Sequence, residues 1–347
     1  MHFGTGTFKA GSLVCAMALF APAASLAQSV ADFYKDRRIT LIVGSDAGSG
    51  YDAYARLLAR HMGDHIPGRP GLIVQNMPGG GGLTAANYLY NVAPRDGIMI
   101  GGMQRGVIIL PLTAPVGVKF DSQKFQWIGS TTAESGVVAV WHTAPHKTIA
   151  DVIDHEIIIG GSGAATDSET LPRVYNKTLG TKFRIISGYK STGAILLAVE
   201  RGEVQGIGNS SWSNWQTAFS HYLLDGRVSV LMQAGLDRNP ELPNIPFALD
   251  LARSPQDRQI LELFLAPNTI GRPFAAPPET PPDRVAAMRA AFGAMVNDKA
   301  FIADAKKANM DLSPVSGIFI QQTLERLSAT PMDVLAQARA AIETEKR

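Results

Sequence analysis

Apolar runs of strand character alternate along the chain with stretches in which apolar residues recur at helical spacing. The run ITLIV at 39–43 is followed by a helical pattern through Leu58 and Met62. Further runs of strand character lie at 71–75, 97–102, 137–141, 156–161, 182–186 and 227–232. Strands separated by helices of about ten or more residues are typical of an open, mostly parallel α/β sheet. Because the runs are too numerous for one small sheet, we predict two α/β domains.

The C-terminal part of the chain has a different, mainly helical pattern. Pro281 and Pro282 open a helix with an apolar face. Further helical patterns cover 299–308, 316–328 and 332–344. The Pro-rich stretch before this region, 240–282, is interpreted as connections with one short helix near 255–265.

The first 27 residues have the composition of an export signal. Lys9 is their only charged residue, and the apolar stretch after it ends in the small-x-small triplet SLA at 25–27. A retained membrane anchor is the alternative, but Pro22 and the short apolar core disfavour a full span. We therefore expect a signal peptide at 1–27, cleavage after Ala27, and a mature protein in the periplasm.

Composition and charge narrow the classes of function. The chain is 46% hydrophobic and 18% charged, with a formal net charge of +2, and no basic cluster indicates a nucleic-acid-binding face. The histidines, at 2, 61, 65, 142, 146, 155 and 221, lack the grouping of a metal site. The only cysteine, Cys15, lies in the export signal. We therefore expect no nucleic-acid partner, no metal and no cofactor.

Glycine-rich polar turns recur where a strand leads into a helix. They read GSDAGSGYD at 44–52, PGGGGLT at 78–84, GGSGAATDS at 160–168 and SGYKSTG at 187–193. The first N–H groups of a helix have no partner inside it and point outward at its positive dipole end. Glycine lets an anion approach these groups, and in open α/β sheets such turns lie at the ligand-binding edge. For a single turn an ordinary βα connection is the favoured interpretation. Four such turns weaken that interpretation and support an anion site, and both stay open.

The candidate ligand-binding residues come from these turns and from two later segments, 104–105 and 208–215. They are Ser45, Asp46, Gly48, Ser49, Gly50, Tyr51, Asp52, Gly80, Gly81, Gly82, Gln104, Ser162, Gly163, Thr166, Tyr189, Lys190, Ser191, Asn209 and Trp212. Arg105 is a further candidate polar contact, although the interpretation we favour places it at the surface. Trp212 and Trp215 form either an aromatic wall for a ring-bearing ligand or structural packing, and the sequence leaves both open.

Acidic residues in the turns restrict the ligand. Asp46, Asp52 and Asp167 are unfavourable beside a bound anion unless they point away or pair with a cationic part of the ligand. An amino-acid-like carboxylate is therefore one option. The interpretation we favour is that Asp52 and Asp167 cap helices.

Enzymatic functions are the alternative class. An exported serine hydrolase could use Ser162 or Ser187, although no His–Asp pattern lies nearby in sequence. The segment from Ser187 to Lys190 matches the S-x-x-K motif of penicillin-recognising enzymes. Those enzymes have their K-T-G motif far from S-x-x-K in the sequence, whereas here the K-T-G-like residues overlap it. A nucleotide P-loop is absent from the sequence, and Thr166 replaces the last glycine of a dinucleotide motif.

The same segments resemble a known family. RRITLIVGSDAGSGYDAYARLLARHM at 37–62 and PGLIVQNMPGGGGLTAANYLYNVAPRDGIMIGG at 70–102 are similar to the N-terminal half of the tripartite tricarboxylate transporter substrate-binding proteins, the Bug or TctC family. The matching residues are Asp52, Ala55, Arg56, Asn76, Pro78, Gly79, Gly81, Gly82, Asn87, Ala93, Pro94, Asp96 and Gly97. Tyr189, Lys190, Gly202 and Val204 match a later segment, and RNPELPNIPFALD at 238–250 resembles another.

The resemblance implies a fold and a function. It implies a two-lobed periplasmic-binding-protein fold, type II-like, with a ligand cleft and a hinge of two crossing segments. Lobe 1 would comprise 28–140 and 235–347, and lobe 2 would comprise 141–234. Backbone amides of the first two turns would hold the carboxylate of a small solute, which a monomeric protein would deliver to a membrane permease. The first turn departs from the family's pattern, because Asp46 and Tyr51 stand where small or apolar residues are common.

Overall fold

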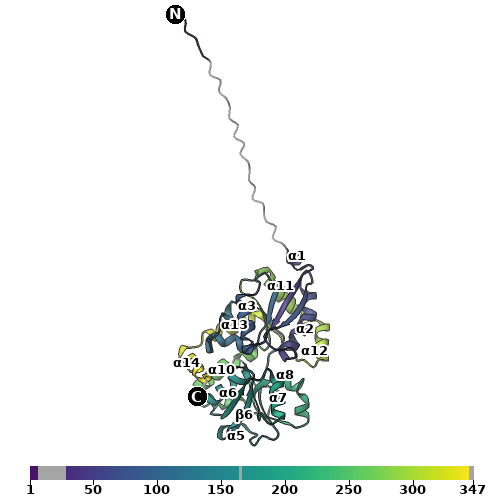
Figure 1. The fold of residues 1–347 in the computed structure, drawn as a ribbon, viewed down its shortest axis with the longest axis vertical. Coiled ribbons are helices and arrows are strands. Elements are labelled where there is room, and N and C mark those ends of the chain that lie inside the picture. The colour runs from purple at the N-terminus through teal and green to yellow at the C-terminus, as the bar shows by residue number, and fades with distance from the viewer. Residues whose placement is uncertain (7–28, 164–165, 344–347) are drawn as a thin grey trace.

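The protein has two lobes, each built on its own β-sheet (Figure 1). The structure is a computed structural model, and it describes residues 1–6, 29–163 and 166–343. The predicted cleavage site after Ala27 lies outside the described residues. In the part of the chain that is described, no helix has both the length and the apolar character needed to cross a membrane.

Lobe 1 contains a mixed six-stranded sheet in the order β11-β4-β10-β3-β1-β2. Its strands are β1 (Arg38–Val43), β2 (Gly71–Asn76), β3 (Met99–Gly102), β4 (Gln126–Ser130), β10 (Pro273–Ala276) and β11 (Val315–Ser316). The helices that precede, follow or cover these strands are α1 (Val30–Tyr34), α2 (Gly50–His65), α3 (Leu83–Asn91), α4 (Leu110–Thr113), α11 (Pro282–Met295), α12 (Lys299–Lys307) and α13 (Gly317–Ser328). β1 pairs in parallel with β2 and β3, whereas β10 and β11 run antiparallel to their neighbours.

Lobe 2 contains a five-stranded sheet in the order β7-β6-β8-β5-β9. Its strands are β5 (Gly136–Trp141), β6 (Ile157–Gly161), β7 (Phe183–Ser187), β8 (Gly206–Ser211) and β9 (Val228–Ala234). The helices within this stretch of chain are α5 (Ile149–Asp154), α6 (Asp167–Leu179), α7 (Thr192–Glu200), α8 (Trp212–Gln216) and α9 (Ser220–Leu224). The two-lobed α/β fold that the resemblance implied is confirmed.

The expectation of mostly parallel sheets is wrong, because both sheets are mixed. The chain leaves lobe 1 after β4 and returns into β10, so these two neighbours run in opposite directions. In the same way β5 enters lobe 2 and β9 leaves it, and they pair antiparallel. The antiparallel pairs are thus a consequence of a chain that crosses between the lobes and comes back.

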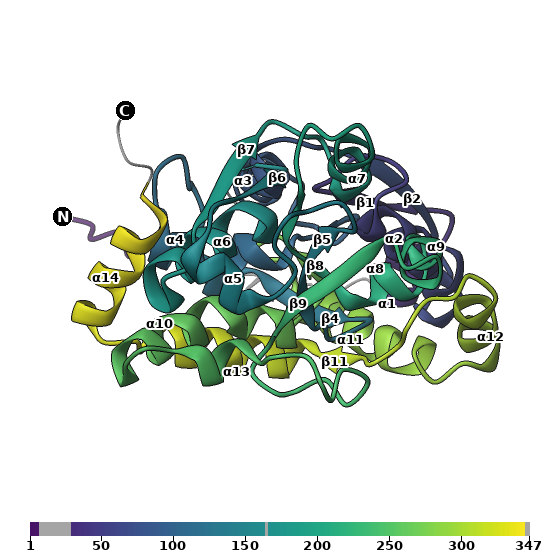
Figure 2. The same cartoon turned by 90° about the horizontal axis from the view of Figure 1, so that it is seen from below.

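The predicted C-terminal helices are present, and two helices of this half of the chain also contact lobe 2. α10 (Pro255–Leu265) and α14 (Met332–Ile342) both pack against α6, whereas α13 packs against β4 of lobe 1. Seen from below, α10 and α13 lie side by side along one edge of the molecule (Figure 2). The division of the chain into lobes at 140 and 235 stays a prediction.

Candidate functional site

The first turn is organised by Asp52, the third residue of α2. Its carboxylate accepts hydrogen bonds from the Gly48 N–H at 2.8 Å, from Asn76 Nδ2 at 2.9 Å and from Arg56 Nε at 2.9 Å. The Ser49 hydroxyl caps the helix by accepting from the Asp52 N–H at 3.2 Å. Asp52 is buried. Its carboxylate therefore holds the turn and α2 together. The interpretation that Asp52 and Asp167 cap helices is wrong, because Ser49 and Thr166 are at the N-cap positions of α2 and α6.

A pH-dependent stability follows from this arrangement. Burial raises the pKa of Asp52, but the hydrogen bonds from Arg56, Gly48 and Asn76 lower it by more, so its pKa lies below the ordinary value. A depressed folded-state pKa stabilises the protein above the unfolded pKa of about 3.9, and this contribution is lost as the pH falls through the folded pKa. Asp52→Asn should therefore lower the free energy of unfolding at pH 7, and the difference from wild type should shrink below about pH 4.

Denaturant unfolding at pH 7 and at pH 3 measures this difference. Asp64→Asn is the matched control, because Asp64 is an exposed residue of the same helix. If Asp52→Asn lowered the free energy of unfolding by the same amount at both pH values, the depressed pKa of Asp52 would be contradicted.

The second turn is formed by four glycines that all have positive φ. The φ angles of Gly79, Gly80, Gly81 and Gly82 are 134°, 56°, 66° and 95°, in the region that favours glycine. Close packing adds a second reason at Gly82, where a Cβ would lie 3.1 Å from Gln104 Cγ. The Gly82 Cα also lies 3.1 Å from the position that a Cβ on Gly44 would occupy. The glycine run thus lets the first and second turns meet backbone to backbone.

The turns of lobe 2 satisfy most of their own polar groups. Ser162 Oγ lies 3.0 Å from Ser168 Oγ and 3.3 Å from Thr166 Oγ1. The N–H of Ser162 donates to Ser168 Oγ at 3.1 Å, and the N–H of Gly163 donates to Glu169 Oε1 at 2.7 Å. Two amides that the sequence offered to a ligand therefore bond to side chains of α6.

Arg105 joins the two lobes. It follows β3 in lobe 1, and its Nε donates to the Asp167 carboxylate at 2.7 Å, at the start of α6 in lobe 2. Its Nη1 donates to Ser211 Oγ of lobe 2 at 3.1 Å. The expectation that Arg105 lies at the surface is wrong: it is 3% exposed, because the other lobe covers it.

The surroundings fix the protonation states at this junction. Burial lowers the pKa of Arg105, but Asp167, Tyr51 and Glu134 together raise it by more, so the guanidinium stays charged. Burial raises the pKa of Tyr51, which keeps its hydroxyl protonated. This hydroxyl accepts a hydrogen bond from the Arg105 N–H at 3.2 Å. The lobes approach closely beside the pair, where a Cβ on Gly163 would lie 3.4 Å from the Gly81 nitrogen.

A second buried ion pair lies at the hinge. Arg272 Nε donates to Glu134 Oε1 at 2.8 Å, and both residues lie on segments where the chain crosses between lobes. The Arg272 guanidinium also lies over the rings of Tyr51 and Tyr54, at 5.2 and 4.4 Å from their centroids. A side chain at Gly50 would collide with this guanidinium. Gly50 therefore makes room for Arg272.

The remaining candidates are spread over several environments. Ser45 Oγ lies 2.7 Å from Ser49 Oγ in the first turn, and Gln104 Nε2 donates to the Gly44 carbonyl at 2.9 Å. Ser191 caps α7, and Lys190 is exposed. Asp46 is half-buried, and the Tyr189 hydroxyl lies 3.5 Å from Glu203 Oε2. The structure brings the first three turns together, and the fourth adjoins the third, since the Tyr189 N–H donates to the Gly161 carbonyl at 3.2 Å.

The two tryptophans and Asn209 have structural partners in lobe 2. Trp215 is fully buried, and its indole donates to Ser210 Oγ at 2.6 Å. The Trp212 indole donates to Glu241 Oε2 at 2.7 Å. Asn209, 1% exposed, accepts from the Tyr175 hydroxyl at 3.3 Å. Structural packing accounts for Trp215, whereas an aromatic wall formed by Trp212 stays a hypothesis.

The serine hydrolase alternative gains no support from this geometry. The partners of the Ser162 hydroxyl are other hydroxyls. His61 and His65 contact Asp304 and Asp298. His146 stacks on His155, and His142 and His221 lie against aromatic neighbours. Among the described residues, no contact of Ser162 or Ser187 with a histidine is present.

Comparison with known proteins gives relatives of one kind. No protein-family model matches the chain. It is 27% identical over 246 residues to a UPF0065 protein encoded in the gbd 5' region of Cupriavidus necator, covering 69% of this chain and 72% of that protein. It is 23% identical to a UPF0065 protein of Agrobacterium vitis, over 62% of each chain.

Solved structures share the fold over nearly their whole length. A TctC solute-binding protein from Polaromonas is 20% identical, with a TM-score of 0.61 over 89% of this chain and 99% of that one. The periplasmic binding protein BugD is 19% identical, with a TM-score of 0.68 over 89% and 98%. MatC from Rhodopseudomonas palustris, solved with bound malate, is 18% identical, with a TM-score of 0.66 over 89% and 99%. The resemblance to the TctC and Bug proteins is therefore confirmed, and the chain has their two-lobed solute-binding fold.

Proposed function

We propose that this chain is a periplasmic solute-binding protein that captures a small carboxylate between its lobes and delivers it to a membrane permease. The single observation that carries the proposal is the buried Arg105 guanidinium, which already holds a carboxylate, that of Asp167, at the junction of the lobes. Because the pair carries no net charge, a ligand carboxylate would take the place of Asp167 on this guanidinium. MatC, of the same fold, is a malate-bound protein.

In this proposal the second turn supplies the backbone part of the site. The N–H groups of Gly82 and Thr84 donate to the Gly79 carbonyl, at 3.0 and 3.4 Å, and that of Leu83 donates to the Gly80 carbonyl. The amides that the turn would offer to a ligand are therefore those of Gly80 and Gly81. They lie beside Arg105, because Gly82 packs against Gln104. A ligand carboxylate would take hydrogen bonds from this turn and from the Ser45 and Ser49 hydroxyls. The hydroxyl cluster of Ser162 would add contacts from lobe 2.

Closure of the lobes follows from contacts of this kind. A ligand that touches turns of both lobes binds the closed form better than the open form, and it shifts the equilibrium by that difference in affinity. The Arg105–Asp167 pair contributes to the same closed form without a ligand. Delivery would then require a permease that favours the open form. The monomeric state, the export signal and the periplasmic location belong to the same proposal.

Calorimetric titration tests the function. We expect malate, succinate or adipate to bind, and we expect the neutral adipamide not to bind, because the site recognises charge. Ester hydrolysis should be equal in wild type and Ser162→Ala. Equal binding of adipate and adipamide, or no binding of any of the three dicarboxylates, would contradict the proposal.

A further inference from the structure

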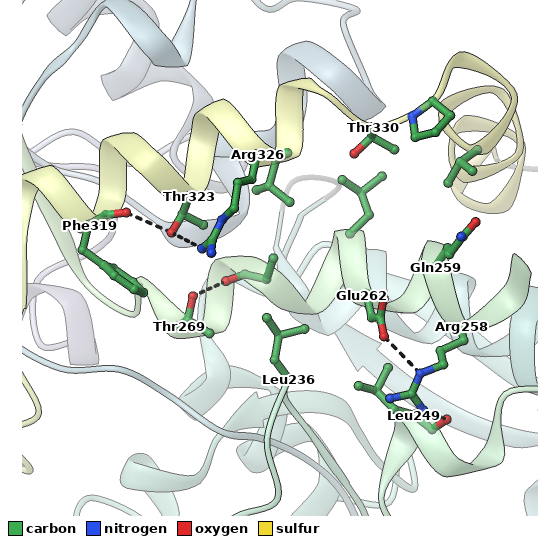
Figure 3. Close-up of a pocket in the computed structure, with 15 residues that line it drawn as sticks. Leu236, Leu249, Arg258, Gln259, Glu262, Thr269, Phe319, Thr323, Arg326 and Thr330 are labelled. Carbon is green, nitrogen blue, oxygen red and sulfur yellow. Dashed lines mark hydrogen bonds and ion pairs between the residues drawn. The ribbon is translucent and has the colours of Figure 1, made fainter. Parts of the chain in front are cut away.

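A second cavity lies away from the glycine-rich turns, between α10, α13 and α14 (Figure 3). Its volume is about 480 Å³, within the range of small-molecule sites. None of the candidate residues of the turns lines it. Its walls come from helices on both lobes, since α10 and α14 pack on α6 and α13 packs on β4.

The walls of this cavity are mainly apolar. Leu236, Leu263, Phe319, Leu327 and Val334 line it, and Phe319 is 36% exposed. Apolar surface that stays open to solvent beside a cavity is typical of a binding site. The body of an apolar ligand would therefore be removed from water here.

The charged side chains of the cavity determine which charge a ligand should carry. Arg258 is paired, because its Nε donates to Glu262 Oε1 and its Nη1 to the Leu249 carbonyl, both at 3.0 Å. Arg326 differs: its Nη2 donates to Thr323 Oγ1 at 3.1 Å, and it forms no ion pair with an acidic residue in the described part of the chain. Figure 3 shows its guanidinium beside Thr323 of the same helix and on the side of Thr269. The cavity therefore combines apolar walls with one uncompensated cation.

We propose that this cavity is a second ligand site, which takes a small amphipathic carboxylate. The apolar part would lie against Leu263, Phe319 and Val334, and the carboxylate would accept hydrogen bonds from Arg326. A guanidinium can hold a carboxylate with two parallel hydrogen bonds. The ligand class differs from that of the cleft, where the donors are backbone amides, hydroxyls and Arg105.

Calorimetry with octanoate tests the site directly, with 1-octanol as the uncharged probe of the same length. Arg326→Gln should weaken octanoate binding by about 10- to 150-fold, the effect of losing a charge-assisted hydrogen bond. It should leave octanol binding unchanged. Arg184→Gln is the matched control, because Arg184 is an exposed residue of β7 paired with Glu156, and it should bind octanoate like wild type.

Two further variants separate this site from the cleft. Thr330→Trp adds bulk in the loop that lines the cavity, and it should reduce the binding of both probes while leaving adipate binding intact. Ser162→Ala changes the cleft without breaking an ion pair between the lobes, and it should leave octanoate binding unchanged. Octanoate binding that survives Arg326→Gln and Thr330→Trp, or that is lost in Ser162→Ala, would overturn the proposal. So would an absence of octanoate binding at millimolar concentration.

Discussion

Replacing Arg105 by Gln should release the two lobes from each other and increase the radius of gyration of the ligand-free protein. The Arg105 and Asp167 side chains are 4% and 21% exposed and form an ion pair that exists only while the lobes meet. Removing one partner of a buried pair costs about 3–5 kcal/mol, because the other charge stays buried without compensation. The closure equilibrium should therefore shift toward the open form by about two to four orders of magnitude.

Small-angle scattering of ligand-free protein measures the change. Asp167→Asn should act in the same direction, and the double variant should cost less than the sum of the two single variants, because the unpaired charge is gone. Arg227→Gln is the control, since Arg227 belongs to an exposed pair within lobe 2. An unchanged radius in both single variants would show that the pair does not hold the lobes together.

Glu134→Gln should lower the melting temperature by roughly 5–15 °C, because it leaves Arg272 as an unpaired cation at the hinge. The side chains of Arg272 and Glu134 are 3% and 1% exposed, so water cannot replace the lost partner. Two hydrogen bonds from Ser213 Oγ to the Glu134 carboxylate are weakened as well.

A double replacement and an exposed pair provide the controls for this melt. Glu134→Leu with Arg272→Met should recover part of the loss, since apolar groups of similar size can replace a buried pair. Glu262→Gln breaks the pair with Arg258, whose side chains are 43% and 46% exposed, and should cost less than about 1 kcal/mol. A Glu134→Gln melt that coincides with that of Glu262→Gln would exclude the stabilising role.

The strands that the sequence predicts are those with continuous apolar runs. β1 and β5 contain five or more consecutive apolar or β-branched residues. β4, β8, β10 and β11 are missing from the prediction because they are short or rich in Gly and Ser, as QWIGS and GIGNSS illustrate. β8 is buried throughout, so its position in the sheet depends on its neighbours rather than on its own pattern.

The sequence predicts only those parts of the site whose residues are close together in the chain. A strand, a glycine-rich turn and a helix are adjacent in the chain, so the four turns could be found. The two buried ion pairs join residues 62 and 138 positions apart. The first requires the lobes to meet, and the second requires β4 and β10 to pair in lobe 1. Arg105 carries a weak signal, because it directly follows a strand and a turn residue, Gln104. Arg272, in a Pro-rich connection, carries none that periodicity can detect.

The glycine run shows the same limit in one segment. The sequence predicts a close approach at 78–84, and the structure identifies two: Gly82 with Gly44 inside lobe 1, and Gly81 with Gly163 between lobes. Because the φ of Gly81 is positive, 66°, a substitution at this position is not a clean test of ligand binding. A valine at this position would strain the backbone, so lost binding would not be separable from lost stability.

The backbone amides can instead be observed without mutation. In the proposed mode of binding, Gly81 of the second turn and Ser162 of the hydroxyl cluster in lobe 2 both lie at the ligand, so their amides report on it. The test is amide NMR of the labelled protein during titration with the dicarboxylate that binds most tightly in calorimetry. We predict that both resonances shift and saturate at the calorimetric Kd. Saturable binding with neither resonance shifted would place the ligand elsewhere and contradict the account.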